Sequence, residues 1–150
     1  MAQGMDLLEA LKTKDLDQAL KTVIAHFKCE IGTIHKIESD GKLHLRAHTA
    51  GIPDPILEAS KVIPLGKGIA GRAAQNKKPT NMKSLQADTD PRIPIAAKAD
   101  DTIGAVCVPL LDGDKVVGTI GIAVKGERAF SPGEEELLTS AGRVIAQQMG

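Results

Sequence analysis

Two Asp-Gly turns constrain the fold of this chain more than any other feature. Asp40-Gly41 separates the segments "IGTIHKI" and "KLHLRAH", in which apolar and polar residues largely alternate. Asp112-Gly113-Asp114 separates "IGAVCVPLL" from "KVVGTIGIAV". Because Asp-Gly between two such segments favours the tight turn of a β-hairpin, the sequence predicts two antiparallel hairpins.

Segments with the helical period precede the first hairpin and follow the second. Near the N-terminus, apolar residues recur at steps of three and four: Leu7, Leu8, Leu11, Leu16, Leu20, Val23, Ile24 and Phe27. Asp15 is expected to cap the second of these helices. At the other end, Ser131, Pro132 and Glu134 form the start of a helix, with an S-x-x-E capping box.

Between the hairpins we expect short elements and one long loop. Short helices are predicted around residues 54–60 and 69–76, and brief strands in "KVIPL" and "PTNM". Residues 83–100 are predicted to be a loop. Strands outnumber crossover helices, so the fold class is α+β with a mainly antiparallel sheet, in one domain of residues 1–150.

The composition excludes several classes of partner. Lys and Arg number 19, and so do Asp and Glu, which disfavours nucleic acid or a membrane surface as the main partner. No Trp or Tyr is available to stack on single strands. No apolar run is long enough to cross a membrane, and Cys29 and Cys107 have no metal-ligand spacing. We expect a cytoplasmic protein.

Gly66, Gly68 and Gly71 have the G-x-G-x-x-G spacing of dinucleotide-binding loops. The preceding strand contains a proline, the following helix is short, and the second parallel strand is missing, so dinucleotide binding is not expected. A structural role remains: a positive φ at Gly66, entry into the helix at Gly68, and close packing of Gly71 on the sheet. The N–H groups of Ile69 and Ala70 are candidates for holding a small anion.

The order of three motifs resembles the GAF domain over essentially the whole chain. They are "VIPLGKGIAGRAAQNKKPTNM", "GAVCVPLLDGDKVVGTIGIA" and "FSPGEEELLTSAGRVIAQQM". The resemblance implies an α/β sandwich with a sheet of about six strands. Terminal helices would cover one face, and short helices and a loop would cover a ligand pocket on the other. It also implies a sensory module.

Three chemistries known in GAF domains leave signatures that can be checked. The aromatic residue of the cyclic-nucleotide set cannot be supplied, because Phe27 and Phe130 lie in or beside the terminal helices. The loop of residues 83–100 lacks the Cys-His pair that would attach a bilin. Reduction of free methionine-(R)-sulfoxide needs two paired thiols, and Cys29 and Cys107 are not placed for this.

A two-residue turn at Asp40-Gly41 would pair Thr33 with His48 and His35 with Arg46. One face of the hairpin would then be polar, with Thr33, His35, His44, Arg46 and His48. The other face would be core, with Ile34, Leu43, Leu45 and Ala47. We expect no metal site. The histidines are either solvated and hydrogen-bonded or the wall of a pocket for an anionic ligand.

The second hairpin also has two unlike faces. Its bulky face holds Val106, Val108, Leu110, Val116, Ile120, Ile122 and Val124. Its other face holds Ala105, Cys107, Thr119 and Gly121, small residues that would either line a cavity or admit a closely packed helix. Arg92, in the long loop, is the best candidate to close over a carboxylate or phosphate.

We therefore expect a stand-alone sensory domain that binds an unidentified small molecule without a cofactor and without catalysis. Its terminal helices are expected to pair two copies and to transmit the response to a signalling protein. The alternatives are a methionine-sulfoxide reductase and a pocket-free protein-interaction module. The expected ligand-binding residues are Thr33, His35, Arg46, His48, Ile69, Ala70, Met82, Arg92, Ala105, Cys107 and Thr119.

Overall fold

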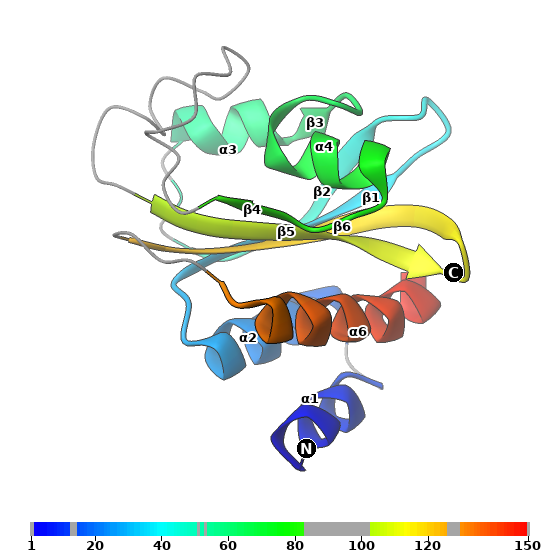
Figure 1. The fold of residues 1–150 in the computed structure, drawn as a ribbon. Coiled ribbons are helices and arrows are strands. Elements are labelled where there is room, and N and C mark those ends of the chain that lie inside the picture. The colour runs from blue at the N-terminus through cyan, green and yellow to red at the C-terminus, as the bar shows by residue number, and fades with distance from the viewer. Residues whose placement is uncertain are drawn as a thin grey trace.

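The computed structural model describes residues 2–12, 15–50, 52, 54–82, 103–125 and 130–149 (Figure 1). Six strands form one sheet: β1 (Ile31–Ile37), β2 (Leu43–His48), β3 (Val62–Ile63), β4 (Thr80–Met82), β5 (Ile103–Asp112) and β6 (Lys115–Lys125). Their order is β3-β2-β1-β6-β5-β4, and each of these neighbouring pairs is antiparallel. The predicted α+β class and antiparallel sheet are confirmed, with β3 only two residues long.

The helices form two layers on opposite faces of this sheet (Figure 1). The terminal helices, α1 (Ala2–Leu11), α2 (Leu16–Phe27) and α6 (Pro132–Met149), lie on one side. On the other side are α3 (Asp54–Ser60) and α4 (Gly68–Asn76). We call these sides the terminal-helix face and the α3/α4 face. The predicted arrangement of the helices about the sheet is confirmed.

The helix ends follow the predicted capping chemistry. The N–H of Gln18 donates to the Asp15 carboxylate over 2.8 Å, so Asp15 caps α2. At the start of α6, the N–H of Glu134 donates to the Ser131 hydroxyl over 3.1 Å, and the Ser131 N–H donates to the Glu134 carboxylate over 2.9 Å. This reciprocal pair is the predicted capping box.

The main hydrophobic core lies between the sheet and the terminal helices, and we call it the helix-side core. It contains Leu11 and Leu20 from the N-terminal helices, and Ile145 from α6. A smaller α4-side cluster lies on the opposite face. Its buried members are Leu43, Ala70, Ala73, Ala74 and Cys107.

The predicted register of the first hairpin is correct at one end and wrong at the other. The loop has three residues, with Gly41 at φ +77° and its N–H donating to the Glu38 carbonyl over 2.9 Å. Thr33 still faces His48, because β2 contains one extra residue, Arg46, opposite the step from Ile34 to His35. Between this bulge and the turn, each residue of β1 faces the β2 residue one position before the predicted one.

The bulge changes the faces that three predicted residues occupy. Leu43 lies in the α4-side cluster and Leu45 faces His35, so neither belongs to the helix-side core as predicted. His44 faces Lys36 and bonds to the Asp40 carboxylate over 2.9 Å, so it does not share a face with His35. A bulge cannot be recognised from the alternation of apolar and polar residues, because it inserts one residue and leaves the sequence pattern on either side unchanged.

The second hairpin contains a similar irregularity between Leu110 and Leu111. As a result Val117 packs against the helix-side core, whereas Val116 packs against the α4-side cluster. The predicted position of Val116 on the bulky face is therefore wrong. Val106, Val108, Leu110, Ile120 and Ile122 lie in the helix-side core as predicted.

The glycine-rich segment forms the turn that leads into α4. Gly66 has φ +86°, as predicted, and α4 begins at Gly68. A Cβ on Gly71 would lie 2.6 Å from the Pro64 carbonyl oxygen and 3.1 Å from the Gly66 nitrogen. Gly71 therefore permits close packing of α4 against this turn, and not against the sheet as predicted.

Replacing Gly71 with alanine is expected to lower the free energy of unfolding by about 1–3 kcal/mol, measured by urea denaturation. The sign is informative, since Gly→Ala inside a helix otherwise stabilises by about 0.5–1 kcal/mol. Gly121→Ala is the matched control, because its Cβ would come no closer than 3.5 Å to its neighbours. Equal stability of the two variants would contradict this account of the turn.

Candidate functional site

Two polar side chains are buried on the α3/α4 face of the sheet. His35 in β1 is 2% exposed, and Thr119 in β6 is 0% exposed. They are directly opposite each other in the antiparallel pairing of β1 with β6. Side chains at such positions share one face of a sheet. Ile34, which precedes His35 in β1, and Ile120, which follows Thr119 in β6, point into the helix-side core.

Of the two ring nitrogens of His35, one has a hydrogen-bond partner among the described residues and the other does not. Its Nε2 lies 2.8 Å from the carbonyl oxygen of Ser60, at the end of α3. A carbonyl can only accept a hydrogen bond, so Nε2 carries the proton. Within the described part of the chain, Nδ1 has no hydrogen-bond partner.

Burial lowers the pKa of His35 below its ordinary value of 6.5. The hydrogen bond to Ser60 opposes this shift, and the charge of His44 adds to it. The ring is therefore neutral at pH 7, and Nδ1 presents a lone pair. An acceptor that stays buried without a partner costs about 1–3 kcal/mol.

The hydroxyl of Thr119 is the second unsatisfied group. Among the residues that the structure describes, none is a hydrogen-bond partner of Thr119 Oγ1. Its polar neighbour is the thiol of Cys107. Burial raises the pKa of Cys107 to about 12, and a side-chain interaction with the Thr119 hydroxyl acts in the opposite direction. This contact falls outside the geometry of a full hydrogen bond, and a protonated thiol is only a weak hydrogen-bonding group, so the hydroxyl can accept a stronger partner.

The surroundings of this pair are small. A Cβ built on Gly121 would lie 3.5 Å from the sulfur of Cys107 and 3.7 Å from the hydroxyl oxygen of Thr33. These are ordinary contact distances, so at least a methyl group fits here. Cys107 packs against the alanines of α4, in the α4-side cluster. The small residues thus admit a closely packed helix at Cys107, and at Gly121 they leave room for a methyl group.

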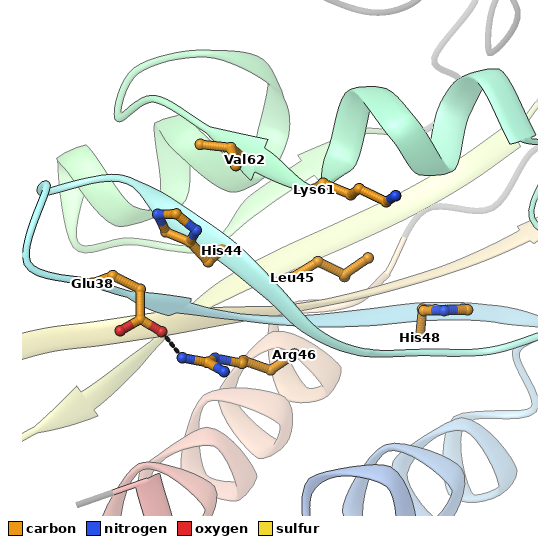
Figure 2. Close-up of a pocket in the computed structure, with 7 residues that line it drawn as sticks. All are labelled: Glu38, His44, Leu45, Arg46, His48, Lys61 and Val62. Atoms are coloured by element: carbon orange, nitrogen blue, oxygen red, sulfur yellow. Dashed lines mark hydrogen bonds and ion pairs between the residues drawn. The ribbon is translucent and has the colours of Figure 1, made fainter.

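The remaining predicted residues of the first hairpin lie apart from this pair. Arg46, the bulged residue, is ion-paired with Glu38, and Figure 2 shows the two side chains turned toward each other. His48 is exposed, and its Nδ1 donates to the Thr49 carbonyl over 2.9 Å. These residues border a shallow groove at the β2–β3 edge, lined by Glu38, His44, Leu45, Arg46, His48, Lys61 and Val62 (Figure 2).

Asp40, at the tip of the first hairpin, holds His44 beside this groove. The carboxylate accepts the backbone N–H of Lys42 over 2.9 Å and contacts His44 Nε2 over 2.9 Å. The hydrogen bond from Lys42 and then that from His44 lower the pKa of Asp40. His44 is thus engaged by a local carboxylate and is not directed at the buried pair.

The structure divides the predicted site residues into three sets. Thr33, His35, Ala105, Cys107 and Thr119 lie together on the α3/α4 face, and Ile69 and Ala70 lie in α4 above it. Arg46 and His48 border the edge groove. For Met82 only the backbone is described, paired with Ala105, and Arg92 lies outside the described residues.

Sequence reasoning missed Ser60 and Glu38. Ser60 acts through its carbonyl oxygen, which every residue has, so the sequence carries no signal for it. Glu38 lies just beyond β1 and Arg46 is the bulged residue of β2, so no predicted strand pair places these two side chains together. In the described ranges, three or more His, Cys, Asp or Glu side chains do not gather at any point where they could hold a metal ion. Nor do those ranges contain a helix long and apolar enough to span a membrane.

Comparison with solved structures supports the fold. The chain is similar to the GAF domain of an Acinetobacter phosphoenolpyruvate-protein phosphotransferase, with 16% identity, a TM-score of 0.77, and 97% of this chain and 89% of that chain covered. It is also similar to a type II free methionine-R-sulfoxide reductase from Thermoplasma acidophilum, with 22% identity, a TM-score of 0.72, and 95% and 94% covered. A third is the free methionine-R-sulfoxide reductase from Neisseria meningitidis in complex with its substrate, with 14% identity, a TM-score of 0.77, and 97% and 84% covered.

Comparison of the sequence itself gives a sharper result. A family model described as GAF domain matches residues 13–149, which is nearly the whole chain. No curated protein matches. At the identities above, the solved structures establish the shape of the chain and leave its chemistry to be argued from its own residues.

The neutral state of His35 predicts a pH dependence of stability. The pKa of His35 is lower in the folded than in the unfolded protein, so the unfolded state binds the proton more readily. The stability contributed by the neutral ring is present above about pH 6.5 and is lost as the pH falls. We expect His35→Gln to lose less stability than the wild type between pH 7.5 and 5, in urea denaturation.

Thr119→Val serves as the control for this experiment, because it changes the neighbouring buried side chain without changing a titratable group. It should keep the pH dependence of the wild type. A His35→Gln variant whose stability falls with pH as steeply as that of the wild type would show that the ring is not held neutral by burial.

Proposed function

The chain belongs to the GAF domain family, and from this premise we propose that it is a sensory domain that binds a small molecule on the α3/α4 face of its sheet. The ligand is held without a cofactor and without covalent attachment. The domain is not an enzyme, and it acts by a change in the packing of its helices.

The observation that carries this proposal is the contrast between the two faces of the sheet. The terminal-helix face is covered by the hydrophobic helix-side core. The α3/α4 face has two buried polar atoms, on His35 and Thr119, for which the described residues supply no hydrogen-bond partner, and a small residue, Gly121, beside them. Buried polar groups in folded proteins are almost always satisfied, so such a pair is the place where a ligand is expected.

The same face argues against reductase activity. The chain has two cysteines, and they lie on opposite faces of the sheet. Cys29 packs against the helix-side core, whereas Cys107 lies in the α4-side cluster with its pKa raised to about 12. A reductase needs a thiolate and a second thiol that can reach it. We therefore propose no turnover of free methionine sulfoxide, which can be followed as loss of that substrate.

The terminal helices are the proposed route of output. Both ends of the chain lie in one helical layer, where the side-chain amide of Gln148 in α6 donates to the Leu11 carbonyl in α1. A ligand that moves the sheet would change the packing of this layer. That change would alter the contacts of the terminal helices with a second copy or with a signalling partner. Light scattering that shows only monomers at high concentration would exclude the homodimer.

The proposed compartment is the cytoplasm, because the two free thiols suit its reducing conditions.

Ligand binding is tested by a thermal-shift screen against small metabolites. A ligand present at 100 times its Kd stabilises the folded state by about 2.7 kcal/mol, which raises the Tm by about 5 to 10 °C. Gly121→Leu should abolish this shift, because its side chain would project onto the α3/α4 face beside Thr33 and Cys107.

Gly133→Leu is the matched control, since Gly133 is exposed in the first turn of α6. It should respond to the ligand as the wild type does. If no metabolite raises the Tm of the wild-type protein, or if Gly121→Leu responds equally well, the ligand-binding proposal fails. A pocket-free module that binds a protein partner would then be the better account.

A further inference from the structure

The unsatisfied groups of His35 and Thr119 specify the chemistry of the ligand. We propose that the ligand is uncharged and presents a hydrogen-bond donor to Nδ1 of His35 beside an acceptor for the hydroxyl of Thr119, as the N–H and C=O edge of an amide or lactam does. This rests on the proposed function, because it concerns the ligand of the same site.

The requirement for a donor follows from the tautomer of His35. The Nε2–H of His35 donates a hydrogen bond to the Ser60 carbonyl over 2.8 Å, so the neutral ring has only a lone pair at Nδ1. A lone pair repels the oxygens of a carboxylate or phosphate and attracts an N–H or O–H group. The hydroxyl of Thr119, in contrast, can donate to a carbonyl oxygen.

The requirement for an uncharged ligand follows from the neighbours of the pair. The described side chains around Gly121 belong to Thr33 and Cys107, and neither is charged. Of the two arginines expected to meet an anion, Arg46 is paired with Glu38 beside the edge groove, and Arg92 lies outside the described residues. An ion placed between His35 and Thr119 would lose its hydration without gaining a counter-charge from these neighbours. The expected anionic ligand does not suit this part of the molecule.

The requirement for adjacent groups follows from the strand pairing. His35 and Thr119 are partners across β1 and β6, so their Cβ atoms are about 5 Å apart. One planar amide edge can reach both. A single buried water could also satisfy both atoms, and the experiment must distinguish it from a ligand.

Small lactams test this specificity directly. The probes are 2-pyrrolidinone, which has the N–H and C=O edge, and γ-butyrolactone, which has the same shape without the donor. Acetate and inorganic phosphate are the anionic probes. Each is added at about 10 mM, suited to a Kd near 1 mM. Binding is read from the ¹⁵N resonance of His35 Nδ1 in protein labelled at histidine, which moves when that nitrogen accepts a hydrogen bond.

We expect 2-pyrrolidinone to move the Nδ1 resonance of His35, and the lactone and both anions to leave it unchanged. Thr119→Val, which removes the hydroxyl and keeps the shape, should weaken 2-pyrrolidinone about fivefold to tenfold. Thr139→Val is the matched control. The Thr139 hydroxyl donates to the Glu135 carbonyl over 2.8 Å within α6, and its loss should not affect binding.

The outcomes separate this inference from the proposed function. If the lactone or an anion binds as well as 2-pyrrolidinone and Gly121→Leu abolishes that binding, the site stands and the amide specificity is overturned. The same holds if a metabolite from the thermal screen binds without moving the Nδ1 resonance. If neither 2-pyrrolidinone nor any metabolite binds, the pair holds only water, and both proposals fail.

Discussion

The pairing of β1 with β6 is the contact on which the rest of the structure depends. It joins two hairpins that are far apart in the sequence into one sheet, in the order β3-β2-β1-β6-β5-β4. Gly118 makes this pairing possible, because a Cβ there would overlap the carbonyl oxygen of His35. The same pairing places His35 opposite Thr119. The strand pairing that joins the two hairpins into one sheet therefore also brings together the two residues of the candidate site.

The two faces of the sheet are covered in different ways. Aliphatic residues from both hairpins point toward the terminal helices and exclude water there. On the opposite face the central strands carry small or polar side chains, and α4 covers part of them with alanines. Among the described residues, the two buried side-chain polar atoms without partners both lie on this second face. The face that the terminal helices leave uncovered is the one on which we propose that a ligand binds.

Much of this could be predicted from local sequence. The two hairpins, the caps at Asp15 and Ser131, the positive φ of Gly66 and the residues of the helix-side core all follow from short-range rules. The candidate site was predicted in outline, since Thr33, His35, Ala105, Cys107 and Thr119 do share a face. The prediction failed where a bulge intervened, at Arg46 and Val116, because one inserted residue reverses the faces without leaving a mark in the sequence pattern.

The sequence by itself determined the strands, the turns, the helix ends and the apolar side of the sheet, because each depends on residues within a few positions of one another. Only the tertiary structure decided which polar groups remain unsatisfied. The Ser60 carbonyl reaches His35 from 25 residues away, and it selects the nitrogen that carries the proton. Whether a buried atom has a partner depends on the positions of all the chain around it, and no local pattern contains that information.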